Sequence, residues 1–414
     1  MERTTKRRSA IQHIKNFLSR CDSRSSCWAV LFLALVILIV PFFRPAIVLH
    51  LDSPIFKDWY FYLRVCAIAL SVAVFVLVGK RDLFFVCLCA FCLAPLASTL
   101  LFQGKMVLWI QQYLSYFAVV LLVLAIARYS IKSLLSAVCF VTATLLVINF
   151  ASAVMYPNGM WDASQYFYGN RNGLFMLALP SVGCSLMLDR LASKVMSLRS
   201  VFLAAIAYLT LCISFSATTF LALTMMLGAS LLVLNKRIRC ALNGYTYLVL
   251  IVVAFVAIVL LRVQEHLPFA VTDVFGKSST FTGRTPVWDI VLTPDGLRYL
   301  LLGHGIPSEA YIAGPVMRLN AHNLFLHVWY TGGLVSTVAL AIMLVLTGNR
   351  LYAVRESGPV AIAAAMLGAF LVVGLMEAEP YPAFYCALAI AYAIGSKYSE
   401  KKREELCVTP ELES

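Results

Sequence analysis

Charged residues are scarce in this chain. Asp, Glu, Lys and Arg make up 13% of its 414 residues, whereas 61% are hydrophobic. Such a composition is far outside the range of soluble globular proteins and is typical of a polytopic membrane protein. The 33 basic residues outnumber the 20 acidic ones and stand mostly in short runs at the ends of apolar segments. Because topology signals are distributed in this way, we do not expect nucleic acid as a partner.

A recognisable metal site is also lacking. Cys87, Cys89 and Cys92 lie in an apolar segment without a His or carboxylate to complete a tetrahedral site, so packing inside the membrane explains them better. The polar stretch 281–333 contains no cysteine, no paired carboxylates and no His-x-x-x-His spacing. We therefore expect no metal and no other cofactor.

Apolar runs long enough to cross a bilayer fill most of the chain. We expect twelve spans, at residues 27–43, 60–79, 83–102, 106–127, 133–155, 172–189, 200–214, 218–235, 244–262, 323–347, 359–376 and 382–396. The break near Ser214 is weakly marked, and one long helix there would reverse the orientation of everything after it. Loop charge favours the break, because twelve spans place 23 of the 33 basic residues on the cytoplasmic side.

The expected fold is an all-α polytopic membrane protein with about twelve transmembrane helices. Residues 1–26 form a basic cytoplasmic segment, 27–396 a single transmembrane domain, and 397–414 a cytoplasmic tail. Two loops fall outside: a large one at about 262–322, between the ninth and tenth helices, and a shorter one at 156–172. The large loop is too polar for a bilayer, so we expect the chemistry there.

Arg284 has a chemical context within the large loop. Thr285 followed by Pro286 is typical of a helix N-cap with proline at the first helical position. Arg284 then precedes a helix N-terminus, where free backbone N–H groups already favour an anion such as phosphate. A surface pair with Asp289 or Asp295 explains this arginine equally well.

His322 is the candidate general base. It follows Asn320, a candidate N-cap, and is therefore expected in the first turn of the helix that re-enters the membrane. The positive end of that helix and nearby arginines favour the neutral imidazole, the form that a general base requires. A structural role is nevertheless the commoner one for a lone histidine at a membrane interface.

Four short motifs occur in a distinctive order. They are GNRN (169–172), GR-x-x-x-W (283–288), LLGHG (301–305) and HN-x-x-L followed by two glycines (322–333). On a twelve-span chain with its large loop between the ninth and tenth spans, this order resembles the O-antigen polymerase and ligase superfamily.

The resemblance implies a GT-C-like glycosyltransferase in the bacterial cytoplasmic membrane. Such an enzyme moves a glycan from an undecaprenyl diphosphate carrier to a sugar hydroxyl on the external face, with inversion and without a metal. Carried over by position, His322 would be the base and Arg284 would bind the diphosphate. The implied partners are the lipid-linked oligosaccharide, membrane lipid, a flippase and a chain-length regulator.

One motif of the superfamily is incomplete. Relatives carry S-x-S-R at the outer turn between the seventh and eighth spans, and here Ala217 stands in place of the Arg. Arg171 is the expected substitute, with Arg262 and Arg318 behind it. The expected substrate-binding set is completed by Asn172, Trp288 and Asn323.

The shorter external loop bears on the choice of acceptor. Its YPNG followed by GNRN is more similar to capsule and exopolysaccharide polymerases, which favours a polymerase that extends a second lipid-linked repeat unit over a ligase that transfers to a lipid A core. Its aromatic residues, 161 and 166–168, suit either sugar stacking or interface anchoring. A lipid-linked oligosaccharide flippase is the alternative from another class. The helix centres are almost free of the ionisable groups that ion-coupled transporters usually keep there.

Overall fold

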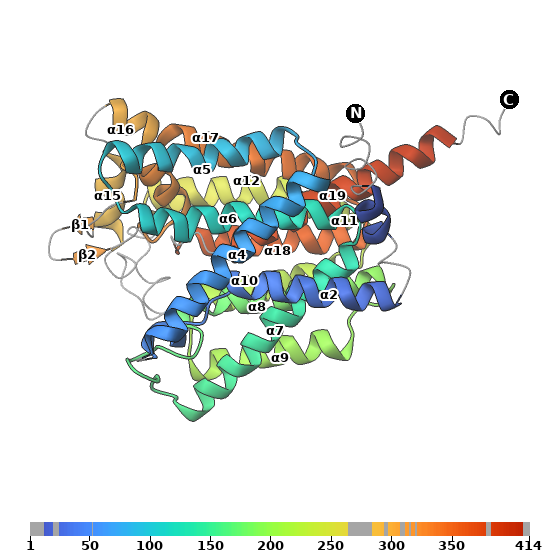
Figure 1. Cartoon of the computed structure of the whole chain (residues 1–414), viewed down its shortest axis with the longest axis horizontal. Coiled ribbons are helices and arrows are strands. Elements are labelled where there is room, and N and C mark those ends of the chain that lie inside the picture. Colours follow the sequence, from blue (N-terminus) through green and yellow to red (C-terminus); the bar gives the residue numbers. More distant parts are fainter. Residues whose placement is uncertain are drawn as a thin grey trace, which may run out of the picture.

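The computed structural model describes residues 12–19, 25–51, 53–263, 284–293, 297–306, 311–313, 316–318, 321–377 and 382–408. Within these ranges, long apolar helices form a bundle whose members run roughly along one axis, with α4 and α7 more inclined (Figure 1). The bundle helices are α2 (Ser25–Ile39), α4 (Pro54–Val78), α5 (Leu83–Leu101), α6 (Met106–Ala127), α7 (Ile131–Met155), α8 (Phe175–Leu191), α9 (Leu198–Ile213), α10 (Ala217–Leu232), α12 (Gly244–Phe255), which η3 (Val256–Leu260) continues, α17 (Leu324–Ala353), α18 (Gly358–Gly374) and α19 (Pro382–Val408).

The fold is that of a polytopic membrane protein. Six spans among the described residues are long and apolar enough to cross a membrane, and five shorter apolar helices accompany them. Many large apolar side chains on the outside of the bundle are exposed, such as Val30, Ile37 and Val86, as expected for a surface that faces lipid. The helices occupy all twelve predicted ranges, but the number that cross the membrane stays a prediction.

Several predicted boundaries are confirmed. The helix expected at 106–127 is α6, and the weakly marked break is present, because α9 ends at Ile213 and α10 begins at Ala217. Ser216 caps α10, since its side chain accepts a hydrogen bond from the Thr219 N–H. At the C-terminus, α19 continues to Val408, so the predicted tail is helical over its first twelve residues, 397–408.

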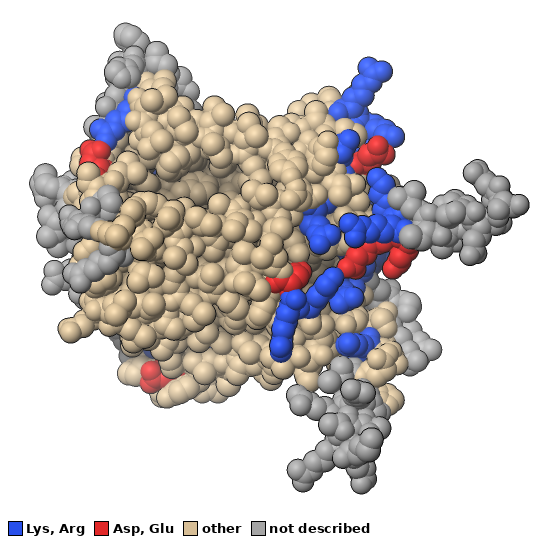
Figure 2. Space-filling model, turned by 90° about the horizontal axis from the view of Figure 1, so that it is seen from above, with Lys and Arg blue, Asp and Glu red and all other residues tan. Residues whose placement is uncertain are grey.

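Short elements cover one end of the bundle. They are η2 (Arg171–Leu174), α15 (Thr285–Leu292), α16 (Leu297–Leu302) and a small antiparallel hairpin of β1 (Tyr311–Ala313) and β2 (Val316–Arg318), which the all-α prediction did not include. Lys and Arg gather at the opposite end (Figure 2). The C-terminal part of α19 extends from that basic end (Figure 1).

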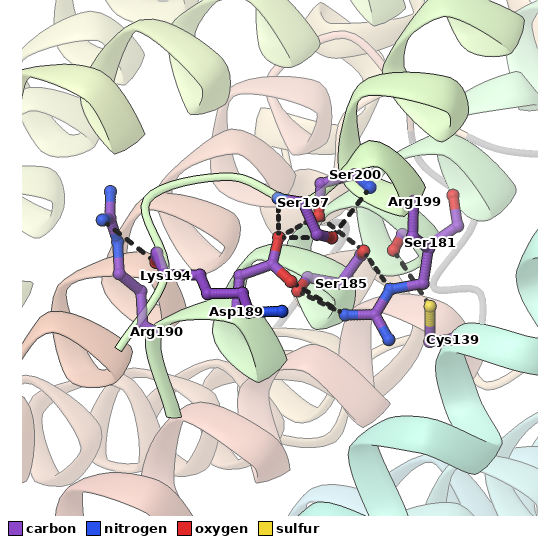
Figure 3. A network of polar contacts seen from close by, with 9 residues as sticks. All are labelled: Cys139, Ser181, Ser185, Asp189, Arg190, Lys194, Ser197, Arg199 and Ser200. Carbon is purple, nitrogen blue, oxygen red and sulfur yellow. Dashed lines mark hydrogen bonds and ion pairs between the residues drawn. The ribbon is translucent and has the colours of Figure 1, made fainter. Parts of the chain in front are cut away.

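A buried carboxylate joins α8 to α9 at the basic end (Figure 3). Asp189 is almost completely buried and accepts hydrogen bonds from the Ser197 N–H at 2.8 Å and the Arg199 guanidinium at 3.1 Å. The hydroxyl groups of Ser197 and Ser200 also donate to it. Because a buried charge is tolerated only when it is paired and hydrogen-bonded, this network fixes the α8–α9 connection.

A break in α17 lets the large loop pack closely at the other end. Gly333 has φ 59° and ψ −158°, and a Cβ there would lie 2.5 Å from the backbone nitrogen of Gly303. Two backbone hydrogen bonds join the loop segment to α17. The His304 N–H donates to the Tyr330 carbonyl at 2.7 Å, and the Gly305 N–H donates to the Thr331 carbonyl at 3.0 Å. The LLGHG motif and the glycines after the HN motif are thus two sides of one contact, which glycine alone permits.

Candidate active site

Three segments that are distant in sequence meet at one carboxylate. Glu377, just after α18, accepts a hydrogen bond through Oε1 from Nη2 of Arg284 at 3.1 Å. Its other oxygen, Oε2, lies 3.7 Å from Nδ1 of His322. The side chains are mostly enclosed, with 14%, 12% and 23% of the Glu377, Arg284 and His322 surfaces exposed. The two residues predicted to be catalytic therefore share one acidic partner.

Arg284 is placed by the start of α15. The helix begins at Thr285, so the prediction that Thr285 is the cap is wrong: Arg284 occupies the cap position, although its side chain forms no capping hydrogen bond. It does immediately precede a helix N-terminus, as predicted. Within the described residues, one of its N–H groups donates to Glu377, and a guanidinium has five. Further donors therefore remain available for a phosphate.

Trp288 supports the segment that carries His322. Its ring is completely buried, and its Nε1–H donates to the carbonyl of Ala321 at 2.9 Å. The ring packs with Val259, Val291 and Leu326 in a small apolar cluster beneath α15. Since Trp288 has no exposed surface in this structure, we interpret it as a positioning residue for His322.

Asn323 caps α17. Its Oδ1 accepts hydrogen bonds from the N–H groups of Phe325 and Leu326, and its Nδ2–H donates to the carbonyl of Leu375 at 3.0 Å. The expectation that His322 lies in the first helical turn is therefore wrong: His322 precedes the cap and has a positive φ of 47°. Asn320 itself lies outside the described residues. Asn323 ties the two helix ends together, which brings His322 and Glu377 into register.

Arg262 forms an ion pair with Asp289 on α15. This contact joins the end of the α12–η3 segment to α15. The geometry therefore supports structural pairing for Arg262 rather than substrate binding. Asp289 pairs with Arg262 and not with Arg284, whose partner is Glu377.

Arg171 and Asn172 lie in a separate turn, the one that precedes α8. Arg171 is exposed and begins η2, and Asn170 caps that turn by accepting a hydrogen bond from the Asn172 N–H. This turn contacts α10, the helix that begins at Ala217, the position at which the S-x-S-R pattern described above would have its arginine. Arg171 is therefore at a suitable place to substitute for it.

Other predicted features are described only in part. The backbone of Arg318 pairs with Tyr311 in the β-hairpin, and its side chain lies outside the described residues. Residues 264–283, which include Gly283 of the GR-x-x-x-W motif, lie entirely outside the described residues. His304 is sandwiched between the rings of Tyr299 and Tyr330, at centroid distances of 4.4 and 4.2 Å, which assigns it to packing.

Sequence reasoning missed Glu377. This residue stands with Glu379 in the short segment between two apolar stretches, where acidic residues by themselves predict no partner. The available signal was its position at the end of α18 on the same side of the bundle as Arg284 and His322. A systematic search of acidic residues at that end would have found it.

The arrangement can perform proton transfer beside an anion-binding group. Glu377 lies beside Nδ1 of His322, and a neutral imidazole can accept a proton at a ring nitrogen. The guanidinium of Arg284 provides positive charge next to that imidazole. Within the described residues no group of three His, Cys, Asp or Glu could hold a metal ion, and the prediction of metal-independent chemistry stays a prediction.

The fold and the site define a polytopic membrane protein with an enclosed cationic and imidazole-bearing site at one end of its helix bundle. Residues 201–341, about a third of the chain, match the family model described as O-antigen ligase. The match confirms the resemblance to the O-antigen polymerase and ligase superfamily. It includes Arg284, Trp288, His322 and Asn323 but neither Arg171 nor Glu377. A search of curated proteins found no match.

Proposed function

We propose that this protein is a membrane polysaccharide polymerase. It transfers a glycan from an undecaprenyl diphosphate carrier to the terminal sugar of a second lipid-linked repeat unit. The observation that carries the proposal is one enclosed site in which the Glu377 carboxylate contacts both His322 and Arg284. His322 and Arg284 lie in the segment that matches the family model, and Glu377 lies outside it.

The chemistry needs a base and an anion-binding group within reach of one sugar. The neutral imidazole of His322 accepts the proton of the acceptor hydroxyl while that oxygen attacks the anomeric carbon of the donor. The new C–O bond forms on the face opposite the leaving group, the bond from the anomeric carbon to the diphosphate oxygen breaks, and the configuration inverts. The diphosphate leaves with both electrons of that bond.

Arginine charge stabilises the leaving group in this mechanism. The diphosphate gains negative charge as it departs, and forked N–H donors bind such an anion well. Arg284 supplies them while Glu377 keeps its side chain in place. Arg171, in the turn against α10, is the second cation, in the place of the arginine missing at Ala217. No step requires a metal or another cofactor.

The orientation of the protein follows from its charge. Lys and Arg gather at the end of the bundle opposite the site (Figure 2). By the positive-inside rule, that end faces the cytoplasm of a bacterial cell, with both chain termini, and the site faces the exterior. Lipid-linked sugars that a flippase has delivered to the outer leaflet would then reach the site directly.

A ligase that transfers the glycan to a lipid A core is the second candidate, and the description of the matching family favours it. The two activities differ only in the acceptor. The polymerase is preferred because the external loop carries YPNG followed by GNRN, the pattern similar to capsule and exopolysaccharide polymerases.

Substitution of the two central residues tests the proposal. His322→Ala and Arg284→Ala are expressed in the native host, with His13→Ala and Arg403→Ala, both exposed, as matched controls. We expect single-repeat lipid-linked units to accumulate on the outer side in the first pair, and long chains in the controls. Substrate trapped on the inner side would instead indicate a flippase. Normal chains in both His322→Ala and Arg284→Ala would refute a role for this site.

A further inference from the structure

A second cationic cavity lies at the same end of the bundle as the candidate active site. It has a volume of about 230 Å³ and lies between α3 (Ile47–His50), the first half of α4 and the start of α6. None of its lining residues belongs to the Glu377 site. Its polar lining consists of Arg44, Lys57, Asp58, Tyr60, Arg64 and Gln111.

The charge of this cavity is unbalanced. Three cationic side chains face a single carboxylate, that of Asp58. Arg64 is fixed in place, because it donates to the carbonyl oxygens of Pro41 and Gln111 and lies over the Tyr60 ring. Arg44 is half-buried, and within the described residues its guanidinium forms no hydrogen bond or ion pair. A half-buried guanidinium without an anion is costly, so the cavity favours an anionic ligand.

Electrostatics within the cavity support the same conclusion. Burial, and then the nearby charge of Arg64, lower the pKa of the Arg44 guanidinium. Two arginines that repel each other are stabilised together by a group with several negative oxygens. A phosphate or diphosphate has that chemistry and matches the forked donors of arginine.

The wall of the cavity is next to a surface that faces lipid. Ile55, Phe56, Trp59 and Tyr62 on α4 are all more than half exposed, and α4 is the least buried of the six long spans. Exposed Trp and Tyr at a helix end are typical of the membrane interface. An anionic group in the cavity could therefore remain attached to a lipid tail that lies along α4.

The cavity is also connected to the turn that holds Arg171. The Ala46 N–H donates to the Tyr168 carbonyl at 3.0 Å, and the Ile47 N–H to the Phe167 carbonyl at 3.2 Å. Asn149 holds the same loop, because its Oδ1 accepts a hydrogen bond from the Tyr168 N–H at 2.9 Å. A ligand in the cavity would therefore lie beside the loop that carries the candidate second cation.

We propose that this cavity binds the diphosphate of the second lipid-linked substrate, the acceptor, while the donor diphosphate binds at Arg284. The inference rests on the proposed polymerase function, since a polymerase must hold two lipid diphosphates at once. It assigns Arg44 and Lys57 as acceptor-binding residues that the sequence motifs do not include.

Binding stoichiometry tests this proposal without any need for turnover. The purified full-length protein is mixed with geranylgeranyl diphosphate, and the bound lipids are counted by native mass spectrometry. We expect two diphosphates on the wild type and one on Arg44→Gln/Lys57→Gln, with the cavity affinity reduced about tenfold or more. Lys105→Gln, an exposed lysine at the start of α6, is the matched control and should bind two. Thermal unfolding of each variant shows that it is folded, and the exposed Lys57→Gln alone repeats the test if Arg44→Gln does not fold.

The remaining outcomes decide the source of the ligand. Displacement of the second lipid by phosphatidylglycerol at equal concentration would overturn the proposal in favour of a general phospholipid site, and so would two diphosphates on the double variant. Failure of the proposed function has a different signature. His322→Ala would then elongate chains normally, while the loss of one bound diphosphate in the cavity variant would still be measurable.

Discussion

The Glu377→Gln substitution is the most direct test of the site. Gln keeps the size of the side chain and removes its charge. Glu377 is the shared partner of Arg284 at 3.1 Å and His322 at 3.7 Å, and all three groups are largely shielded from water. Two unit charges about 4 Å apart attract by about 4 kcal/mol at an effective dielectric constant of about 20. After desolvation, a charged hydrogen bond contributes about 1.5–3 kcal/mol net.

That contribution sets the expected loss of rate. If Glu377 positions both groups for the transition state, its neutralisation should slow transfer about 10- to 150-fold. The assay measures elongation of a lipid-linked repeat unit by the purified protein, with the rate divided by the folded fraction from thermal unfolding. Glu377→Asp should recover part of the rate, because it keeps the charge but is too short to reach both partners.

A matched control separates this effect from the loss of any surface carboxylate. Glu400→Gln removes an exposed carboxylate 3.8 Å from Lys80, and it should elongate chains at the wild-type rate. A Glu377→Gln protein that is folded and transfers at the wild-type rate would refute the reasoning, since neither His322 nor Arg284 would then depend on the carboxylate.

Three further substitutions test the supporting structure. Gly333→Ala should lower the free energy of unfolding by at least about 2 kcal/mol, because φ is positive and the new Cβ would meet backbone atoms. In the same denaturation series, the control Gly228→Ala should leave the free energy of unfolding unchanged, because the space around its Cβ is open. Trp288→Phe leaves the Ala321 carbonyl without its donor, so transfer should fall by about tenfold while the protein stays folded, and an unchanged rate would contradict its positioning role. Asp189→Ala should cost about 2–3 kcal/mol of stability yet leave transfer per folded molecule unchanged, and equal melting temperatures would contradict the network in Figure 3.

The polymerase and the ligase predict different products for different acceptors. With purified protein, a polymerase lengthens chains when the only acceptor is a second lipid-linked repeat unit. A ligase produces no longer chain under those conditions and transfers to a lipid A core when one is added. Transfer to the core alone would replace the polymerase assignment and retain the roles proposed for His322 and Arg284.

Much of the site could be predicted because it depends on local sequence. Thr285 and Pro286 mark a helix start, so the position of Arg284 before that helix was predictable, although the cap residue was not. The position of His322 relative to its helix was less predictable. Asn320 and Asn323 are both plausible caps, and only the path of the chain selects Asn323, which also binds the Leu375 carbonyl on another helix.

By itself, the sequence determined the membrane class, the positions of the helices and the break between α9 and α10. The bilayer constrains the length of an apolar span and the charge of the loops beside it, and both can be read from local sequence. Only the tertiary structure decided that Glu377, 93 residues from Arg284, joins it to His322. It also decided that Trp288 faces inward and that Arg44, Lys57 and Arg64 line one cavity with the single carboxylate of Asp58. The physical reason is that the pairing of charges between helices depends on which helix ends meet, and single charges in short loops carry no sequence pattern that specifies their partner.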